Sequence, residues 1–184
     1  MRGYWLVLLL FAIRYGLLAL VNANALPRVA HYAPMDKTEQ GPYLVYQACN
    51  VMIPGILCFL PVSFGSLIGA VGLIALMAGT ILCAWSVINF ARTPSDSISF
   101  RGVYRFCRHP MYVGYFLFFL GSALMASSWI LLALVVIFQI CAHRLVLAEE
   151  RWCLLTYGQN YDDYMKRTGR YIPKIRGGNM NTKS

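Results

Sequence analysis

The chain has 184 residues, of which 59% are apolar and 12% charged, and its formal net charge is +9 at pH 7. This composition lies outside the range of ordinary soluble domains and predicts a membrane protein. Most basic residues lie in the loops, as expected when positive charge is retained on one side of a membrane, so we expect no nucleic-acid partner. The six cysteines show neither zinc spacing nor a disulfide framework, and we expect no metal.

The hydropathy pattern predicts an all-α integral membrane protein with about five transmembrane helices. Positions 41–91 and 110–142 contain no Asp, Glu, Lys, Arg or His, and each stretch is long enough for two passes, because about 20 apolar residues cross a bilayer. The predicted passes, in chain order, are Tyr4–Val21, Tyr43–Pro61, Leu67–Phe90, Met111–Ser127 and Trp129 to about Leu147. Gly65, just before the third pass, and Gly69 and Gly72 within it favour the close approach of another helix.

We expect one membrane domain over residues 1–184. Its parts are three N-terminal passes (1–91), a loop, helical hairpin and amphipathic C-terminal segment (92–173), and a flexible tail (174–184).

The distribution of charge predicts the orientation in the membrane. Arg2, an apolar run and Ala23-Asn24-Ala25 imitate a cleavable leader. With all five passes retained and the N-terminus outside, however, 13 of the 16 basic residues face the cytosol, in accord with the positive-inside rule. We therefore expect an uncleaved chain with a cytosolic C-terminus, in the cytoplasmic membrane of a prokaryote or the endoplasmic reticulum. Arg14, inside the first pass, can snorkel, pair with a polar group or contact a substrate.

The last two passes form a predicted hairpin that brings distant charged residues together. His109 lies 20 residues before Trp129 at the far tip, and Glu149 lies 20 residues after it. At 1.5 Å per residue both stand about 30 Å from the tip, so they should meet on the cytosolic side. Pro110 suits the first helical turn, whose free N–H groups, with Arg108 and His109, predict a site for a carboxylate or phosphate.

The acidic end of the hairpin has two interpretations. Glu149 and Glu150 close the final predicted helix and offer acceptors for an ammonium, for ribose hydroxyls or for an arginine. Alternatively, Arg108 forms an ion pair with one of them that only fixes the hairpin. A metal site is not predicted, because adjacent helix positions diverge by about 100°.

The C-terminal segment carries aromatic residues at helical spacing. Leu154, Tyr157, Tyr161 and Tyr164 predict one face of a short amphipathic helix. Such a face can anchor the chain at the membrane surface or cover a flat ring such as adenine. After Gly169 the chain is expected to turn and to bring residues 170–173 back toward that face.

At these residues the sequence resembles the isoprenylcysteine carboxyl methyltransferase family and its relatives among the phospholipid methyltransferases. The resemblance runs from about Ser97 to Pro173. The matching pieces are Gly102-Val103-Tyr104, Arg108 through Gly114, Glu149-Glu150, Tyr157-Gly158, Tyr161, Tyr164 and Arg170 through Pro173.

The resemblance implies S-adenosylmethionine as cofactor, a lipophilic or small methyl acceptor that arrives from the lipid bilayer, and a site enclosed by the C-terminal segment. The candidate cofactor contacts, from the resemblance and from the hairpin argument together, are Ser97, Ile98, Tyr104, Arg108, His109, Pro110, Met111, Tyr112, Glu149, Glu150 and Tyr161.

One position departs from the family pattern. The family's arginine for the substrate carboxylate sits four residues before the first matching glutamate, where this chain has Leu145. Its neighbour Arg144 is displaced by about 100° around the helix. Either the helix is locally rotated or the acceptor is not a prenylcysteine carboxylate. With Arg144 orienting the acceptor and Glu149 holding the cofactor, the expected enzyme is a methyltransferase acting on an acceptor that could be a carboxylate.

Two other functions remain open from the sequence. One is a membrane reductase of the sterol type that uses NADPH, and the other is a non-enzymatic scaffold or transport subunit. A reductase site should add basic residues for the extra phosphate and more passes.

Overall fold

The computed structural model describes residues 2–29, 32–94 and 99–174, and within these ranges the chain is built from helices with no β-strand. In chain order the elements are α1 (Tyr4–Phe11), the π-helical turn η1 (Ala12–Leu17), α2 (Leu18–Asn22), the 3-10 turn η2 (Ala23–Ala25), α3 (Leu26–Val29), α4 (Lys37–Phe59), α5 (Leu67–Ala91), the 3-10 turn η3 (Gly102–Arg105), α6 (Pro110–Met125), α7 (Trp129–Tyr157) and α8 (Gln159–Arg167).

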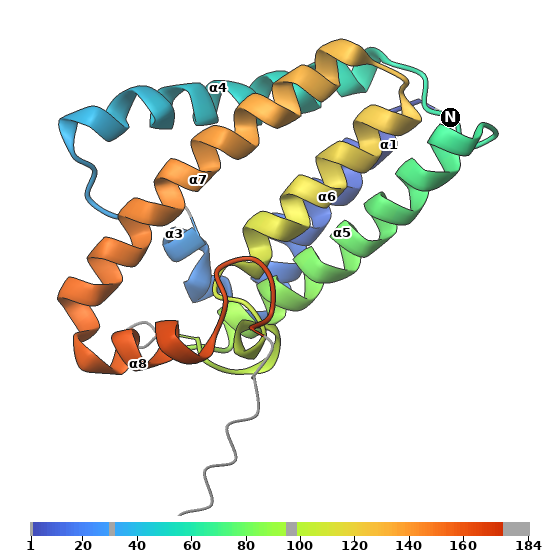
Figure 1. Cartoon of the computed structure of the whole chain (residues 1–184). Coiled ribbons are helices and arrows are strands. Elements are labelled where there is room, and N and C mark those ends of the chain that lie inside the picture. The colour runs from blue at the N-terminus through green and yellow to red at the C-terminus, as the bar shows by residue number, and fades with distance from the viewer. Residues whose placement is uncertain (1, 30–31, 95–98, 175–184) are drawn as a thin grey trace, which may run out of the picture.

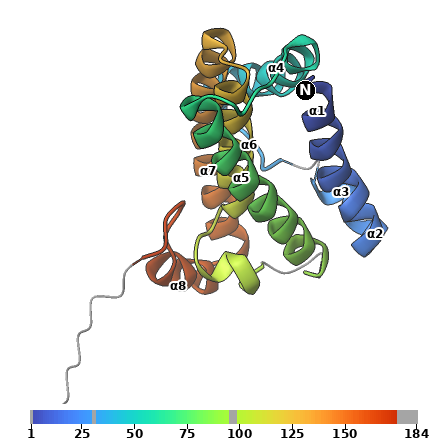
Figure 2. The same cartoon turned by 90° about the vertical axis from the view of Figure 1, so that its right-hand side faces the viewer.

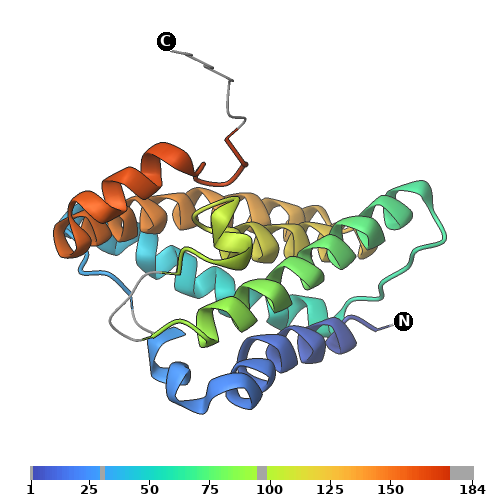
Figure 3. The same ribbon diagram turned by 90° about the horizontal axis from the view of Figure 1, so that it is seen from below.

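The long helices form a bundle whose two ends differ in character. Helix α5 packs along α6, α4 packs along α7, and the first pass lies against α4 and α5 (Figure 1). The loop before α6, the C-terminal part of α7, α8 and residues 168–174 gather at one end, which we call the charged end (Figure 2). Seen from below, α1 lies on the outside of the bundle (Figure 3).

The predicted all-α membrane fold is confirmed. Four helical segments are long and apolar enough to cross a membrane: Tyr4–Ala25, Lys37–Phe59, Leu67–Ala91 and Trp129–Tyr157. Helix α6 is apolar but has only 16 residues, about 24 Å at 1.5 Å per residue. Because the hydrocarbon core is about 30 Å thick, the predicted count of five passes stays a prediction.

Two predicted helix boundaries are wrong. Helix α4 begins at Lys37, six residues before the predicted start, because Asp36 and Glu39 form a capping box. Helix α7 continues to Tyr157, ten residues past the predicted end. Glu149 and Glu150 therefore lie about two turns inside a continuous helix rather than at its end.

The predicted amphipathic helix from Leu154 to Tyr164 is also wrong, because Gly158 divides it. Gly158 has φ 55° and ψ −132°, a conformation that is essentially restricted to glycine. Tyr157 thus ends α7, whereas Tyr161 and Tyr164 belong to α8. The break redirects the chain so that α8 crosses the end of the bundle (Figure 1).

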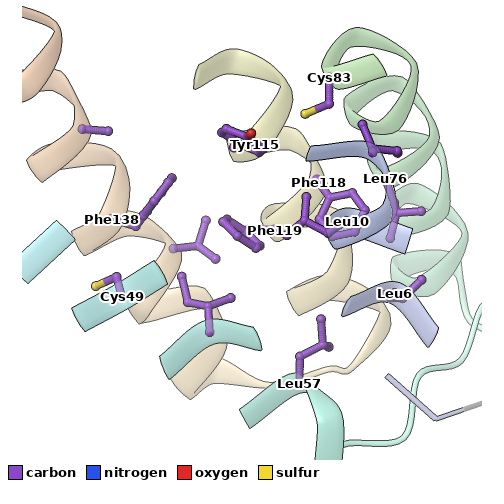
Figure 4. Packing of buried hydrophobic residues seen from close by; sticks show 14 of the residues in the cluster. Leu6, Leu10, Cys49, Leu57, Leu76, Cys83, Tyr115, Phe118, Phe119 and Phe138 are labelled. Atoms are coloured by element: carbon purple, nitrogen blue, oxygen red, sulfur yellow. The ribbon is translucent and has the colours of Figure 1, made fainter. Parts of the chain in front are cut away.

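Glycines allow α5 and α6 to approach closely. A Cβ at Gly72 would lie 2.8 Å from the Gly121 carbonyl oxygen, and one at Gly79 would lie 2.5 Å from the Phe118 backbone nitrogen. The predicted close approach of another helix is confirmed at Gly72. It is wrong at Gly69, where a Cβ would meet Ser63 and Phe64 of the preceding loop, and at Gly65, which precedes the helix and is exposed. Beside this contact, buried side chains from several helices form the core (Figure 4), in which the Phe119 ring lies 5.3 Å from that of Phe138.

The close contact predicts a steric penalty at Gly79. Gly79→Ala should lower the free energy of unfolding by about 1–3 kcal/mol, because the new methyl group meets backbone atoms that have no room to move. Thermal unfolding of the purified protein in detergent measures this. The matched control is Gly55→Ala, where a Cβ meets nothing within 4 Å. Equal stability of the two variants would contradict a close contact between α5 and α6 at Gly79.

Candidate functional site

His109, at the start of α6, faces two carboxylates of α7 at the charged end. Its Nδ1 lies 3.6 Å from Glu149 Oε2, and its Nε2 lies 3.2 Å from Glu150 Oε1. The predicted meeting of these two ends of the hairpin is therefore confirmed. Only the second distance is within the range of a hydrogen bond, so the two adjacent glutamates have different surroundings.

Glu150 is a buried anchor for two arginines. Its side chain is 4% exposed. Oε1 lies 2.8 Å from Arg108 Nη2, and Oε2 accepts from Arg170 Nε at 3.0 Å and from Nη2 at 2.6 Å. The structural ion pair that the sequence left open thus describes Glu150 and Arg108.

Arg108 does not reach the start of α6, where the sequence placed it in an anion site. Besides Glu150, its guanidinium donates to the carbonyl oxygens of Met165 at 3.0 Å and Thr168 at 2.6 Å. Its charge is therefore directed at the C-terminal segment rather than at a ligand on α6.

The C-terminal segment is attached to the loop before α6 by backbone and side-chain hydrogen bonds. Arg108 N–H donates to the Gly169 carbonyl at 2.9 Å, and His109 N–H donates to the Arg170 carbonyl at 3.2 Å. Tyr171 Oη lies 2.8 Å from His143 Nδ1 of α7. The segment turns back after Gly169 as predicted, but the contacts that hold it are with the loop before α6 and with His143 of α7, not with the predicted aromatic face. It uses one of the N–H groups assigned to the anion site, and by position the first helical turn leaves those of Met111 and Tyr112.

Glu149 keeps an acceptor for a ligand. Its Oε2 is buried and has no hydrogen-bond partner among the described residues, although the side chain as a whole is 38% exposed. Tyr112 lies next to this carboxylate, and Tyr104 is close enough to interact electrostatically with it. Burying a carboxylate oxygen without a partner is costly, so this atom is the feature of the site that a bound group would satisfy.

Two phenols beside the carboxylates stay neutral at physiological pH. Burial raises the pKa of Tyr104 well above its ordinary range, and the nearby Glu149 charge adds to the effect. Burial likewise raises the pKa of Tyr171 to about 12. Both side chains therefore offer flat rings and O–H groups without adding charge.

The remaining predicted site residues differ in where they lie. Pro110 is buried at the first position of α6, and Met111 is half-buried beside it. Tyr161 is buried near Cys153 and Arg108. The predictions for Ser97 and Ile98 lie outside the described residues.

Arg144 is not brought to the site. Its side chain is exposed whereas Leu145 is buried, so α7 is not rotated to exchange the two. Five residues separate Arg144 from Glu149, which places them about 140° apart around the helix.

Sequence reasoning did not assign a role to Arg170. It lay within the family-like run 170–173, but no helical period connects it to Glu150 twenty residues earlier. The signal available was one of charge, because two adjacent glutamates on a mostly buried helix require cationic partners. Over the described ranges no group of three or more His, Cys, Asp or Glu side chains is placed to hold a metal ion.

Comparison with known proteins identifies similar sequences. A model of the phospholipid methyltransferase family matches residues 67–160. The chain is 27% identical over 105 residues to the nickel-cobalt-cadmium resistance protein NccN of Alcaligenes xylosoxydans xylosoxydans. The matched region covers 57% of this chain and 49% of that protein. It is 32% identical over 76 residues to the protein-S-isoprenylcysteine O-methyltransferase of Schizosaccharomyces pombe, which covers 40% of this chain and 32% of that protein.

The chain thus spans about half and about a third of the lengths of these two relatives. No solved structure matches it significantly.

The environment of Glu150 predicts that the stability of the charged end depends on the negative charge of this side chain. Glu150→Gln should destabilise the protein by about 3–5 kcal/mol, because it leaves the buried Arg108 without its counter-ion. Thermal unfolding and limited proteolysis of the C-terminal segment measure the loss. Asp162→Asn, which breaks an exposed pair with Lys166, is the control and should leave the unfolding temperature close to that of the wild type. Similar losses in both variants would contradict the anchoring role of Glu150.

Proposed function

Because the chain belongs to the phospholipid methyltransferase family, we propose that it transfers a methyl group from S-adenosylmethionine to a lipophilic or small acceptor in a membrane. The observation that carries the proposal is the buried carboxylate oxygen of Glu149, which accepts no hydrogen bond from the described residues although His109 and Tyr112 lie beside the carboxylate. The name of the Schizosaccharomyces pombe relative, an O-methyltransferase, supports the same reaction class.

The residues at the charged end fit the polar groups of this cofactor. Glu149 Oε2 would accept a hydrogen bond from its ammonium group or from a ribose hydroxyl. The N–H groups at the first turn of α6 would donate to its carboxylate. The neutral rings of Tyr104 and Tyr171 offer apolar faces for a purine. Arg108 and Glu150 act indirectly, by holding the C-terminal segment in place.

The reaction asks little acid-base chemistry of the protein. When bound, S-adenosylmethionine supplies a methyl carbon that its sulfonium already activates for in-line displacement. The protein therefore has to orient the reacting groups and exclude water. Glu149 and His109 would fix the cofactor, and the segment tied down by Arg170 and Tyr171 would shield it from water. Arg144, exposed and turned away from Glu149, is not part of this proposal.

A ligand titration tests the function directly. The purified full chain should gain thermal stability with S-adenosylhomocysteine, because a ligand that binds the folded state raises the unfolding temperature. NADPH should give no such shift. A response to NADPH but not to S-adenosylhomocysteine would support a reductase instead, and the lack of any response would contradict both enzymes.

Variants of the paired residues locate the site. Glu149→Gln and His109→Ala should each weaken S-adenosylhomocysteine binding at least about tenfold, since each removes a charged or directed contact. Calorimetric titration of each purified variant gives the affinity, and its elution profile shows whether it is folded. Asp163→Asn, on the exposed face of α8, is the matched control. Wild-type affinity in both site variants would rule out Glu149 and His109 as cofactor-binding residues.

A further inference from the structure

A second polar site lies in the first half of the chain, away from the His109 and Glu149 cluster. A cavity of about 370 Å³ lies between the first pass and α4, with Phe119 of α6 in its wall. The volume is at the lower end of the range of small-molecule sites. Its polar lining includes Arg14, Tyr32, Tyr43, Gln47 and Asn50, so an apolar part of the bundle holds a concentration of hydrogen-bonding groups.

Among the described residues of that lining, Arg14 is the one with a cationic side chain. It lies on the π-helical turn η1, a type of irregularity that is frequent at functional sites. The guanidinium lies over the rings of Tyr115 at 5.1 Å and Tyr15 at 5.6 Å. These contacts stabilise the cation but leave one hydrogen-bond donor unused, because Arg14 Nε is buried without a partner among the described residues.

No carboxylate within the described ranges lies at ion-pair distance from Arg14; the titratable groups around it are phenols and the Cys83 thiol. A cation inside a membrane helix is costly and usually marks a functional site. An anion placed beside it would supply the missing counter-charge. A protonated amine at the same place would instead be repelled.

Tyrosines connect this cavity to the His109 and Glu149 cluster. The ring of Tyr32, in the cavity wall, lies 6.4 Å from that of Tyr46, which lies 6.5 Å from that of Tyr112. The ring of Tyr112 is 5.9 Å from that of His109. Tyr46 and Tyr112 are each within electrostatic reach of both Arg14 and Glu149. These ring contacts form a continuous connection from the cavity wall to the proposed cofactor site.

The rim of the cavity faces the surroundings of the bundle. Phe11 and Val51 belong to its lining and are 50% and 74% exposed. On a membrane helix such residues contact lipid tails, so a molecule with an apolar chain can enter from the bilayer.

We propose that this cavity binds the methyl acceptor and that Arg14 selects an acceptor with an anionic head group, a carboxylate or a thiolate, on an apolar chain. The proposal rests on the methyltransferase function and names its substrate class. Such a head group needs no base at the moment of attack. A lone pair on the acceptor oxygen or sulfur forms the bond to the methyl carbon while the bond between that carbon and the sulfonium sulfur breaks. The electrons of the broken bond stay on the cofactor sulfur, which becomes a neutral thioether.

Binding of matched probes tests the selection without relying on turnover. Octanoate and octylamine have the same chain length and opposite charge, and each is titrated calorimetrically into the full chain with S-adenosylhomocysteine present. Octanoate should bind at least about tenfold more tightly than octylamine, because only the anion gains from the guanidinium. Equal affinities, or a preference for octylamine, would overturn the proposal.

Variants then assign the effect to Arg14. Arg14→Gln should weaken octanoate binding at least about tenfold, and Arg14→Lys, which keeps the charge, should retain the preference for octanoate over octylamine. Arg167→Gln, an exposed position on α8, is the control for loss of one positive charge and should bind octanoate like the wild type. Octanoate affinity unchanged in Arg14→Gln would overturn the assignment. If Arg14→Gln does not fold, the wild-type preference and Arg14→Lys still decide.

The outcomes separate this proposal from the proposed function. If S-adenosylhomocysteine binds the wild type and octanoate does not, the cavity assignment is wrong and the methyltransferase stands. If octanoate binds through Arg14 and S-adenosylhomocysteine does not bind, the site is an anion site and the methyltransferase falls. Labelled methyl transfer to octanoate or to octane-1-thiol then distinguishes a carboxylate acceptor from a thiol.

Discussion

The charged end of the bundle depends on the placement of one buried carboxylate. Glu150 binds Arg108 from the loop before α6 and Arg170 from the C-terminal segment, and it also contacts His109. Because an uncompensated charge in this environment costs several kcal/mol, these three chain segments are stable only together. The neighbouring Glu149 takes no part in this arginine network, and its Oε2 accepts no hydrogen bond from the described residues. Because Glu150 holds the arginines, the carboxylate of Glu149 is left to bind a ligand.

The two proposed ligand sites are connected through packed side chains of α4, α6 and α7. Tyr46 of α4 stacks on Phe138 of α7 at 4.9 Å and reaches toward Tyr112 of α6. Helix α4 is also fixed to the end of α7, because Arg151 donates to both carboxylate oxygens of Glu39 at 2.8 Å. A methyl donor at the charged end and an acceptor near Arg14 would thus be held by the same helices. Fixed relative positions are what a displacement reaction between two bound molecules requires.

The hairpin could be predicted from the sequence because helix rise is constant and Ser127-Ser128 marks the turn, so the levels of His109 and Glu149 followed by arithmetic. The separate roles of Glu149 and Glu150 could not, because they depend on where Arg170 returns, and that segment has no regular period. Hydropathy likewise located the first pass but not its π-helical turn, since one wider turn leaves the apolar pattern unchanged. Local backbone conformations, such as that of Gly158, are what the predicted helix boundaries missed.

Gly158 joins α7 to α8 in a conformation whose mirror image is an ordinary extended one, and a Cβ built there would meet nothing within 4 Å. Size therefore does not restrict this position; only handedness does. A D-alanine introduced by chemical ligation would adopt these dihedral angles without strain, whereas its L enantiomer would not. The join between the last two helices is thus a stereochemical requirement, one that the genetic code meets with its single achiral residue.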